Sequence, residues 1–175
     1  MDWPEAYNRV VKFLPRWEIV NPDQLGVMVR FGKFKGELEP GVYFCYPYFD
    51  EIYTVTAVSQ VVNLPHQSIK SKDGKTVAIT CAVTFSVLNA EQAILNVDDL
   101  NEQIRCYAGN LISLRINETL FADLNIGELS NQVFSEAGSY LSDYTGIELE
   151  SVNIYDLAQH KIIRLMSGTQ LPSED

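Results

Sequence analysis

The chain has 175 residues, of which 46% are hydrophobic and 21% are charged, a balance that suits a globular protein of one domain or two small halves and excludes general disorder. It carries 13 basic and 23 acidic side chains, so its formal net charge is −10. Residues 1–35 hold six basic and four acidic side chains, which gives this segment +2 and leaves −12 for the remainder. Because an acidic body repels nucleic acid and anionic lipid, an anion-facing surface should lie in the first fifth of the chain.

Cysteine usage and hydropathy suggest where the protein works. Cys45, Cys81 and Cys106 lack metal-ligand spacing, and an odd number makes a poor disulfide framework, which favours a reducing compartment. No apolar stretch approaches the roughly 18 residues that a membrane-spanning helix needs. The first residues also lack the basic start and apolar run of a signal peptide. We therefore expect a cytoplasmic protein.

Residues 3–17 are expected to form an amphipathic helix whose regular part ends at Leu14, because the residue before Pro15 disfavours the helical conformation. Such a helix would collect apolar side chains on one face and polar and basic ones on the other. The candidate membrane-contact residues are Trp3, Tyr7, Val10, Val11, Leu14 and Trp17, and the candidate contacts to anionic lipid are Arg9, Lys12 and Arg16. The alternative is that this helix packs on its own sheet or on a neighbouring subunit.

The segment that follows reads as short strands separated by turns. Residues 21–23 form a turn, residues 27–31 a strand and residues 32–39 a loop. Pro40-Gly41 has the order of a type II turn, in which glycine takes the positive φ. Further short strands are expected over residues 42–46, 52–58 and 61–64.

A hairpin and a long strand give the clearest local pattern. Residues 72–75, Lys-Asp-Gly-Lys, are typical of a type I′ hairpin turn. Residues 77–88 then alternate with period two between a strongly apolar face and a more polar one, which predicts one long strand.

The period changes from two to 3.6 after Leu88, which predicts helices. Asn89 should cap a short helix over residues 90–96, and Asp98 a long one that buries Leu100, Ile104, Tyr107, Ala108, Leu111, Leu114 and Leu120. Asn125 should open another, which has Glu128 at the capping-box position and buries Ile126, Leu129, Val133, Ala137, Tyr140, Leu141 and Tyr144. Gly146 should end it, followed by a strand over residues 147–155, a short helix over residues 157–166 and a polar tail. The order predicts an α+β fold with a largely antiparallel sheet.

Residues that could carry out chemistry are few. The sequence has neither a glycine-rich phosphate loop nor a nucleophile elbow. Its histidines are His66 and His160, and a Cys–His pair with Cys81 or Cys106 is disfavoured because both cysteines fall on predicted core faces. The hypothesis of an enzyme that uses Asp73 or Cys81 in a cleft is supported only by the types of these two residues. We therefore expect no catalytic residue, no cofactor and no metal.

Aromatic residues are concentrated in residues 43–49, Tyr-Phe-Cys-Tyr-Pro-Tyr-Phe. One interpretation is a strand core with tyrosine hydroxyls at its edge. The other is an exposed interaction patch in which Cys45 is lipidated at a membrane.

Several short motifs, in their order and spacing, resemble the SPFH (band 7) domain family, which includes stomatins, prohibitins, flotillins and bacterial modulators of a membrane protease. The motifs are Pro22-x-x-x-Gly26-Val27, Arg30-Phe31-Gly32-Lys33, Leu38-Glu39-Pro40-Gly41-Val42-Tyr43-Phe44 with Pro47 and Asp50, Leu64-Pro65-x-Gln67-Ser68-Ile69, Lys72-Asp73-Gly74, and Gly146-Ile147-Glu148-Leu149 with Asp156. The resemblance implies a strand-rich antiparallel first half and an α/β half with two main helices and a returning strand. It divides the chain into an N-terminal amphipathic segment (1–19), an SPFH-like domain (20–156) and a short C-terminal helix with a polar tail (157–175).

The resemblance also implies a non-enzymatic scaffold at the cytoplasmic face of the inner or plasma membrane. Its expected partners are copies of itself or other SPFH subunits, the lipid surface and a membrane-bound ATP-dependent protease, but not nucleic acid. Many family members carry a membrane anchor and a long coiled coil, for which this sequence shows no pattern. An alternative is therefore a soluble interaction module that binds and modulates an SPFH-type oligomer or its partner protease.

Overall fold

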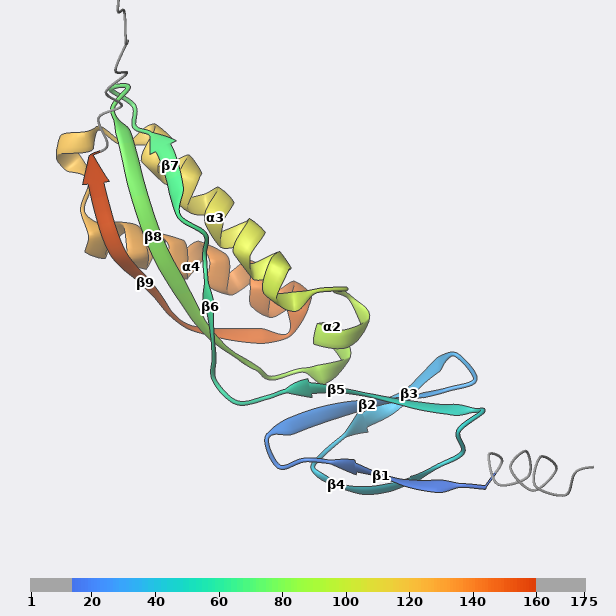
Figure 1. Cartoon of the computed structure of the whole chain (residues 1–175). Helices are drawn as coiled ribbons and strands as arrows, with labels where there is room; N and C mark the ends of the chain where they lie inside the picture. The colour runs from blue at the N-terminus through green and yellow to red at the C-terminus, as the bar shows by residue number, and fades with distance from the viewer. Residues whose placement is uncertain (1–13, 160–175) are drawn as a thin grey trace, which may run out of the picture.

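The computed structural model describes residues 14–159, which form a strand-rich unit and an α/β unit (Figure 1). The elements in chain order are β1 (Arg16–Val20), β2 (Gln24–Arg30), β3 (Lys33–Leu38), β4 (Gly41–Cys45), β5 (Asp50–Thr56), β6 (Gln60–Asn63), β7 (Gln67–Lys70), β8 (Thr76–Val87), α2 (Ala90–Leu95), α3 (Leu100–Glu118), the 3-10 turn η1 (Phe121–Asp123), α4 (Ile126–Thr145) and β9 (Ile147–Gln159). The α+β fold expected from the sequence, with an antiparallel first half, two main helices and a returning strand, is confirmed.

The first unit packs a two-stranded ladder against a three-stranded one. β1 pairs with β4, and β3, β2 and β5 pair in that order, all antiparallel. A Cβ atom on Gly26 of β2 would lie 3.2 Å from Leu38 Cβ and 3.3 Å from Val20 Cγ2. The absence of a side chain at Gly26 therefore lets the two ladders approach closely over the buried side chains of Val20, Val27, Leu38 and Cys45.

The second unit is built around β8, the longest central strand. β6 and β7 pair with one edge of β8 and β9 with the other, while α3 and α4 cover one face of the sheet (Figure 1). The predicted alternation is confirmed, since every second residue of β8 is buried: Val77, Ile79, Cys81, Val83, Phe85 and Val87. These side chains pack against the helices and form the main hydrophobic core of the described residues.

The predicted buried side of α3 is confirmed only in part, since Ile104 and Ala108 are buried as expected. Its fully buried aliphatic positions are Ile104, Ala108, Ile112 and Ile116, at a spacing of four. Leu114 and Leu120, which were expected in the core, are exposed, and Leu100, Tyr107 and Leu111 are half-buried. The N-cap is Asp99, whose carboxylate accepts from the Glu102 N–H at 3.0 Å, rather than Asp98.

The ends of α4 and α2 confirm their predicted caps. Asn125 accepts from the Gly127 N–H at 2.9 Å, Asn89 accepts from the Gln92 N–H at 2.9 Å, and Gly146 ends α4 with φ +66°. On α4, Leu129, Val133, Ala137 and Leu141 are buried as expected, whereas Ile126, Tyr140 and Tyr144 are exposed. The rings of Tyr140 and Tyr144 stack on each other, and Tyr140 also stacks on Tyr107 of α3.

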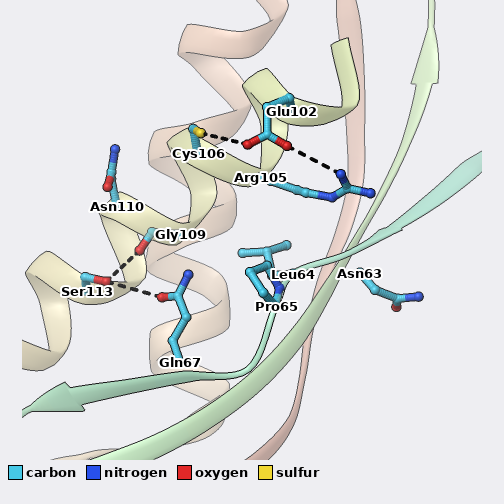
Figure 2. Close-up of a pocket in the computed structure, with 10 residues that line it drawn as sticks. All are labelled: Asn63, Leu64, Pro65, Gln67, Glu102, Arg105, Cys106, Gly109, Asn110 and Ser113. Atoms are coloured by element: carbon cyan, nitrogen blue, oxygen red, sulfur yellow. Dashed lines mark hydrogen bonds and ion pairs between the residues drawn. The ribbon is translucent and has the colours of Figure 1, made fainter. Parts of the chain in front are cut away.

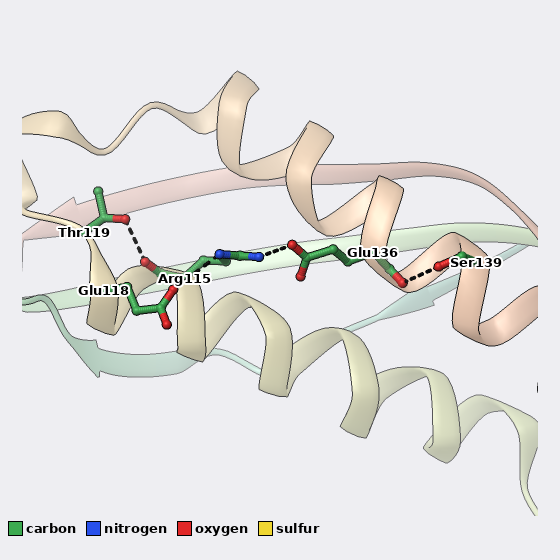
Figure 3. A network of polar contacts seen from close by, with 5 residues as sticks. All are labelled: Arg115, Glu118, Thr119, Glu136 and Ser139. Atoms are coloured by element: carbon green, nitrogen blue, oxygen red, sulfur yellow. Dashed lines mark hydrogen bonds and ion pairs between the residues drawn. The ribbon is translucent and has the colours of Figure 1, made fainter.

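An ion-pair network holds the two long helices together near one end (Figure 3). Arg115 of α3 pairs with Glu136 of α4 and, at 3.3 Å, with Glu118 of its own helix. The Thr119 hydroxyl donates to the Arg115 carbonyl at 2.8 Å, and the Ser139 hydroxyl donates to the Glu136 carbonyl at 3.2 Å. This network adds polar links between helices whose buried faces already pack on the same sheet.

Two of the predicted turns are corrected. Residues 32–39 were expected to be a loop but contain β3, a charged edge strand whose lysine and glutamate residues hid its pattern. Gly41 lacks the positive φ of a type II turn and instead starts β4 opposite Val20.

The β7–β8 hairpin is also closed differently from the prediction. The turn is closed by the Gly74 N–H, which donates to the Ser71 carbonyl at 2.9 Å. Gly74 alone in this turn has a positive φ, so the type I′ prediction is wrong. Asp73 is paired with Lys75 at 2.8 Å, and its carboxylate accepts from the Ser71 hydroxyl and the Phe121 N–H. These contacts lower the pKa of Asp73 far below its usual range.

Two strand boundaries differ as well. The strand β7, which pairs with the start of β8, is not among the strands predicted from the sequence. The final helix was expected from Leu157, yet residues 157–159 belong to β9, where Leu157 pairs with Ile79. The rest of that expected helix lies outside the described residues.

Candidate interaction surface

The β1–β4 ladder has an apolar face that points to solvent. In the antiparallel register Trp17 lies opposite Phe44, and Ile19 lies opposite Val42, so the four side chains share one face. Trp17 is 69% exposed, Ile19 65% and Val42 60%, and Phe44 is also exposed. We call these four residues the outer face. A contiguous apolar patch of this kind is typical of a surface that binds a membrane or another protein.

The opposite face of the same ladder makes the contacts with the rest of the unit. Val20 and Cys45 alternate with the outer-face residues and are buried against the three-stranded sheet. The inner face is thus buried at Val20 and Cys45, although it also carries the exposed Arg16–Glu18 ion pair, whereas the outer face is uncovered within the described residues.

Aromatic rings extend the outer face toward the β4–β5 loop. The ring of Trp17 meets that of Phe44 edge-on at 5.0 Å between centroids, and Phe44 meets Tyr46 edge-on at 5.7 Å. Tyr48 and Phe49 follow in the loop and are exposed as well. Such edge contacts keep the rings in fixed orientations, which favours a preformed contact surface.

A strained turn carries a further aromatic side chain beside this loop. Phe31 and Gly32 connect β2 to β3 with φ +52° and +70°, as in a type I′ turn. A left-handed conformation is rare for a bulky residue and costs about 1–3 kcal/mol. Phe31 is nevertheless 70% exposed, its ring lies 4.8 Å from that of Phe49, and its N–H donates to the Phe49 carbonyl at 2.8 Å. In Figure 1 this turn, the β4–β5 loop and the start of β1 lie at the same edge of the first unit.

One buried carboxylate holds the β4–β5 loop in place. Arg30 Nε and Nη2 donate to the two oxygens of Asp50 at 2.6 and 2.9 Å, and the Tyr46 N–H donates to Asp50 Oδ2 at 3.1 Å. The hydrogen bonds from Arg30 hold the pKa of Asp50 below its usual range, although burial opposes this shift. Asp50 therefore stays charged and fixes the loop that presents Tyr46, Tyr48 and Phe49.

The predicted membrane-contact residues fall partly on this surface. Trp17 and Arg16 belong to β1 and not to a helix, and Leu14 lies exposed just before the strand. The Arg16 side chain points away from the outer face and pairs with Glu18 at 3.1 Å. The other candidates, Trp3, Tyr7, Val10, Val11, Arg9 and Lys12, lie outside the described residues.

Cys45 does not belong to the exposed part of the aromatic segment. Its side chain is on the buried face of β4, and its thiol donates to the Arg16 carbonyl at 3.5 Å. Burial removes the access that acylation of Cys45 would need. Of the two interpretations of residues 43–49, the exposed patch describes Phe44, Tyr46, Tyr48 and Phe49, and the strand core describes Cys45.

Apart from the outer face, the surface has a hollow of about 560 Å³ between α3 and the β6–β7 connection (Figure 2). A Cβ on Gly109 would lie 3.1 Å from Gln67 Nε2, and the Ser113 hydroxyl donates to the Gly109 carbonyl at 2.8 Å. Cys106 lies at its edge and is exposed, so the prediction that it lies in the core is wrong. Cys106 is two residues from both Ile104 and Ala108, which places it on the opposite side of α3 from these buried residues.

The thiols of the described residues are poorly suited to nucleophilic chemistry. Contact with Glu102, at 3.5 Å from the sulfur, raises the pKa of the Cys106 thiol. Burial raises the pKa of Cys81 to about 11. Both shifts disfavour the thiolate, which is the reactive form.

Residues 14–159 contain no group of three or more His, Cys, Asp or Glu side chains that could hold a metal ion. The helices of the same residues are all too short or too polar to span a bilayer.

Sequence reasoning missed part of the exposed surface. Ile19 and Val42 were not singled out, although their period-two relation to Trp17 and Phe44 could have placed them on one face. Tyr140 and Tyr144 were assigned to the core, and nothing in the spacing of α4 marked them as exposed.

Comparison with known proteins agrees with the fold. An uncharacterized protein of Methanocaldococcus jannaschii is 27% identical over 161 residues, which cover 89% of this chain and 79% of that protein. Stomatin-4 of Caenorhabditis elegans is 24% identical over 80% of this chain and 51% of its own length, and human stomatin-like protein 1 is 22% identical over 82% and 35%. The chain thus spans about half or less of these two stomatin relatives. The sequence profile of the SPFH domain / Band 7 family matches residues 18–168, so this chain belongs to that family.

Proposed function

We propose that this protein is a membrane-associated scaffold that assembles with copies of itself and organises membrane proteins or lipids. Membership in the SPFH / Band 7 family supports a stomatin-like scaffold role in general terms, and stomatins are in general non-enzymatic. The observation that carries the proposal is the outer face, which presents Trp17, Ile19, Val42 and Phe44 to solvent on a rigid ladder.

The chemistry of this face suits the interfacial region of a bilayer. Tryptophan, tyrosine and phenylalanine side chains combine large apolar area with rings that settle at headgroup depth, and Tyr46 and Tyr48 extend the outer face with hydroxyl-bearing rings. The N-terminal candidates Trp3, Tyr7, Val10, Val11 and Leu14, with Arg9 and Lys12, precede β1 in the chain and would join the same contact.

The charge distribution favours one orientation on the membrane. Residues 88–159 hold 12 acidic and two basic side chains, a net charge equal to the −10 of the whole chain. Anionic lipid would repel this α/β unit and leave the first unit to make the contact. A single such contact is weak, so self-assembly would strengthen it through avidity. We place the protein peripherally, on the cytoplasmic face of the membrane.

Flotation of the full chain with liposomes tests the membrane contact. Vesicles of phosphatidylcholine, with and without phosphatidylglycerol, would be mixed with the wild type and with the double variant Trp17→Ser/Phe44→Ser. The matched control is Leu114→Ser/Phe134→Ser, which removes two exposed apolar side chains from α3 and α4. We expect the outer-face variant to lose most of its flotation and the control to keep it. Equal recovery of both variants would end the proposal.

A version that lacks residues 1–13 separates the two parts of the surface. If the N-terminal segment contributes, its removal lowers recovery further in vesicles that contain phosphatidylglycerol, because Arg9 and Lys12 are lost. Unchanged recovery would restrict the membrane contact to the described residues. Native mass spectrometry with and without vesicles would measure self-assembly in the same samples.

The outer face also supports a second candidate function, because an exposed apolar patch suits a protein partner as well as a lipid surface. A soluble module that binds an SPFH-type oligomer or its membrane-bound ATP-dependent protease would use the outer face against protein instead of lipid. Co-purification from the native cell, combined with absence of flotation, would support this candidate over the first.

A further inference from the structure

Three tyrosines form a stacked row on the surface where α3 and α4 meet. The rings of Tyr107 and Tyr140 lie 4.2 Å apart at 13°, and those of Tyr140 and Tyr144 lie 5.9 Å apart at 18°. Tyr107 is half-buried, while Tyr140 and Tyr144 are 40% and 45% exposed. We call these residues the tyrosine row. The tyrosine row lies on α3 and α4, whereas the outer face lies on β1 and β4.

A groove of about 320 Å³ begins at one end of the tyrosine row. Tyr144 lines it together with Asp98, Asp99 and Glu102 at the start of α3. The Asn96 side chain donates to the Tyr144 carbonyl at 3.0 Å and so ties the end of α2 to the end of α4. The last ring of the tyrosine row and three carboxylates therefore border the same hollow on the surface.

Two of the three carboxylates of this groove have no ion pair among the described residues. Asp98 and Asp99 have no ion pair there, and Glu102 is paired only with Arg105, at 3.4 Å and on the exposed helix surface. Such an exposed pair contributes little. Because residues 88–159 carry a net −10, the surrounding field also favours a positively charged ligand.

We propose that the tyrosine row and its acidic groove dock an arginine-bearing segment of a partner polypeptide. A guanidinium can stack on the ring of Tyr144, which ends the row and lines the groove, while it donates in parallel to Asp98 or Glu102. Lysine offers a compact, strongly hydrated charge that stacks less well, so arginine is the preferred contact. This site does not depend on the proposed membrane contact, because it uses neither the outer face nor the N-terminal segment.

Fluorescence anisotropy with the full chain tests the site directly. The probes are a labelled peptide of alternating arginine and glycine, the same peptide with lysine in place of arginine, and one with glutamate. We expect the arginine probe to bind most tightly, the lysine probe more weakly and the glutamate probe not at all. Equal binding of the arginine and lysine probes would overturn the stacking contact and with it the proposal.

Two double variants separate this site from general acidity. Asp98→Asn/Glu102→Gln removes two charges from the groove, while Glu128→Gln/Glu148→Gln removes two exposed charges from the start of α4 and from β9. We expect the groove variant to weaken the arginine probe at least about fivefold and the control less than about twofold. Equal losses would show a response to net charge alone and would overturn the proposal.

A tyrosine variant tests the aromatic part. Tyr144→Ser removes one exposed ring, and we expect it to weaken the arginine probe about two- to fivefold while it changes the lysine probe less. Sedimentation of the wild type and of Tyr144→Ser without peptide measures the oligomeric state, and so tests whether another copy of this chain occupies the site. If the wild type forms an oligomer and Tyr144→Ser does not, a second copy of this chain covers the tyrosine row. That result would overturn the proposal of a separate arginine-bearing partner. The outer-face variant Trp17→Ser/Phe44→Ser should bind the probe as the wild type does, whatever its behaviour on vesicles.

Discussion

Arg30 on β2 and Asp50 at the start of β5 form a two-point ion pair whose carboxylate is inaccessible to solvent. The same carboxylate accepts the Tyr46 N–H, so one side chain links two strands to the loop that presents the exposed aromatic residues. The aromatic edge of the first unit thus depends on a polar contact beneath it.

Asp50→Asn is expected to destabilise the chain. The substitution removes the charge that Arg30 faces, and because Arg30 is partly exposed to solvent we expect a loss of about 1–2 kcal/mol in the free energy of unfolding. Urea denaturation would measure it. Glu18→Gln, which breaks the exposed pair with Arg16, is the control and should cost less than about 0.5 kcal/mol. Similar losses in both variants would contradict the importance of the Asp50 contact.

The contribution of Asp50 should depend on pH. Because its pKa is lowered in the folded protein, the stability it contributes is complete above the unfolded pKa of about 3.9 and is lost as the pH falls through the folded value. The difference in unfolding free energy between the wild type and Asp50→Asn should therefore be constant near neutral pH and shrink in strong acid. A difference that grows on acidification would have the wrong sign.

Gly146→Ala tests the close packing at the end of α4, and Gly32→Ala in the β2–β3 turn is its matched control. Both glycines have a positive φ, which costs alanine about 1–2 kcal/mol. A Cβ on Gly146 would also lie 2.8 Å from the Cβ and carbonyl oxygen of Asn89, whereas nothing lies within 4 Å of a Cβ on Gly32. We expect Gly146→Ala to cost about 2–4 kcal/mol in thermal or chemical denaturation and Gly32→Ala only the strain. Equal costs would show that the contact with Asn89 relaxes freely.

Ile112→Ala and Leu114→Ala test which side of α3 is buried. Ile112 is almost fully buried against the sheet, so its truncation should leave a cavity and cost about 2–5 kcal/mol. Leu114 is 50% exposed, and its truncation should change the free energy of unfolding by no more than about 0.5 kcal/mol. A larger loss for Leu114→Ala than for Ile112→Ala would show that Leu114 lies on the buried side of α3, as the sequence predicted.

The long helix shows where periodicity stops being informative. The predicted stripe contains Leu100, Ile104, Tyr107, Ala108, Leu111 and Leu114, whereas the fully buried aliphatic set is Ile104, Ala108, Ile112 and Ile116. The two sets share Ile104 and Ala108 and both satisfy a period of 3.6, so the spacing alone could not choose between them. Packing against the sheet selected the second set, whose small and β-branched side chains let α3 lie close to it. Cys106 lies on neither stripe and is exposed.

The candidate interaction surface was predicted in part. The sequence identified Trp17 and the aromatic segment at residues 43–49, and the structure brings Trp17 opposite Phe44. It could not place Trp17 in a strand, because the apolar spacing of residues 3–14 extends through Trp17 and only Pro15 interrupts it. The membrane contact of Trp3, Tyr7, Val10 and Val11 remains a prediction.

The amino-acid sequence by itself determined the α+β class, the long central strand, the two main helices with the caps at Asn89, Asn125 and Gly146, and the family, because these depend on local spacing and turn chemistry. It missed β1, β3 and β7. Only the tertiary structure decided which apolar residues are covered. Alternation shows that Trp17 and Ile19 share a face, but the partner that buries Val20 and Cys45 on the other side comes from distant strands. The exposed outer face follows from that long-range packing, which no local pattern contains.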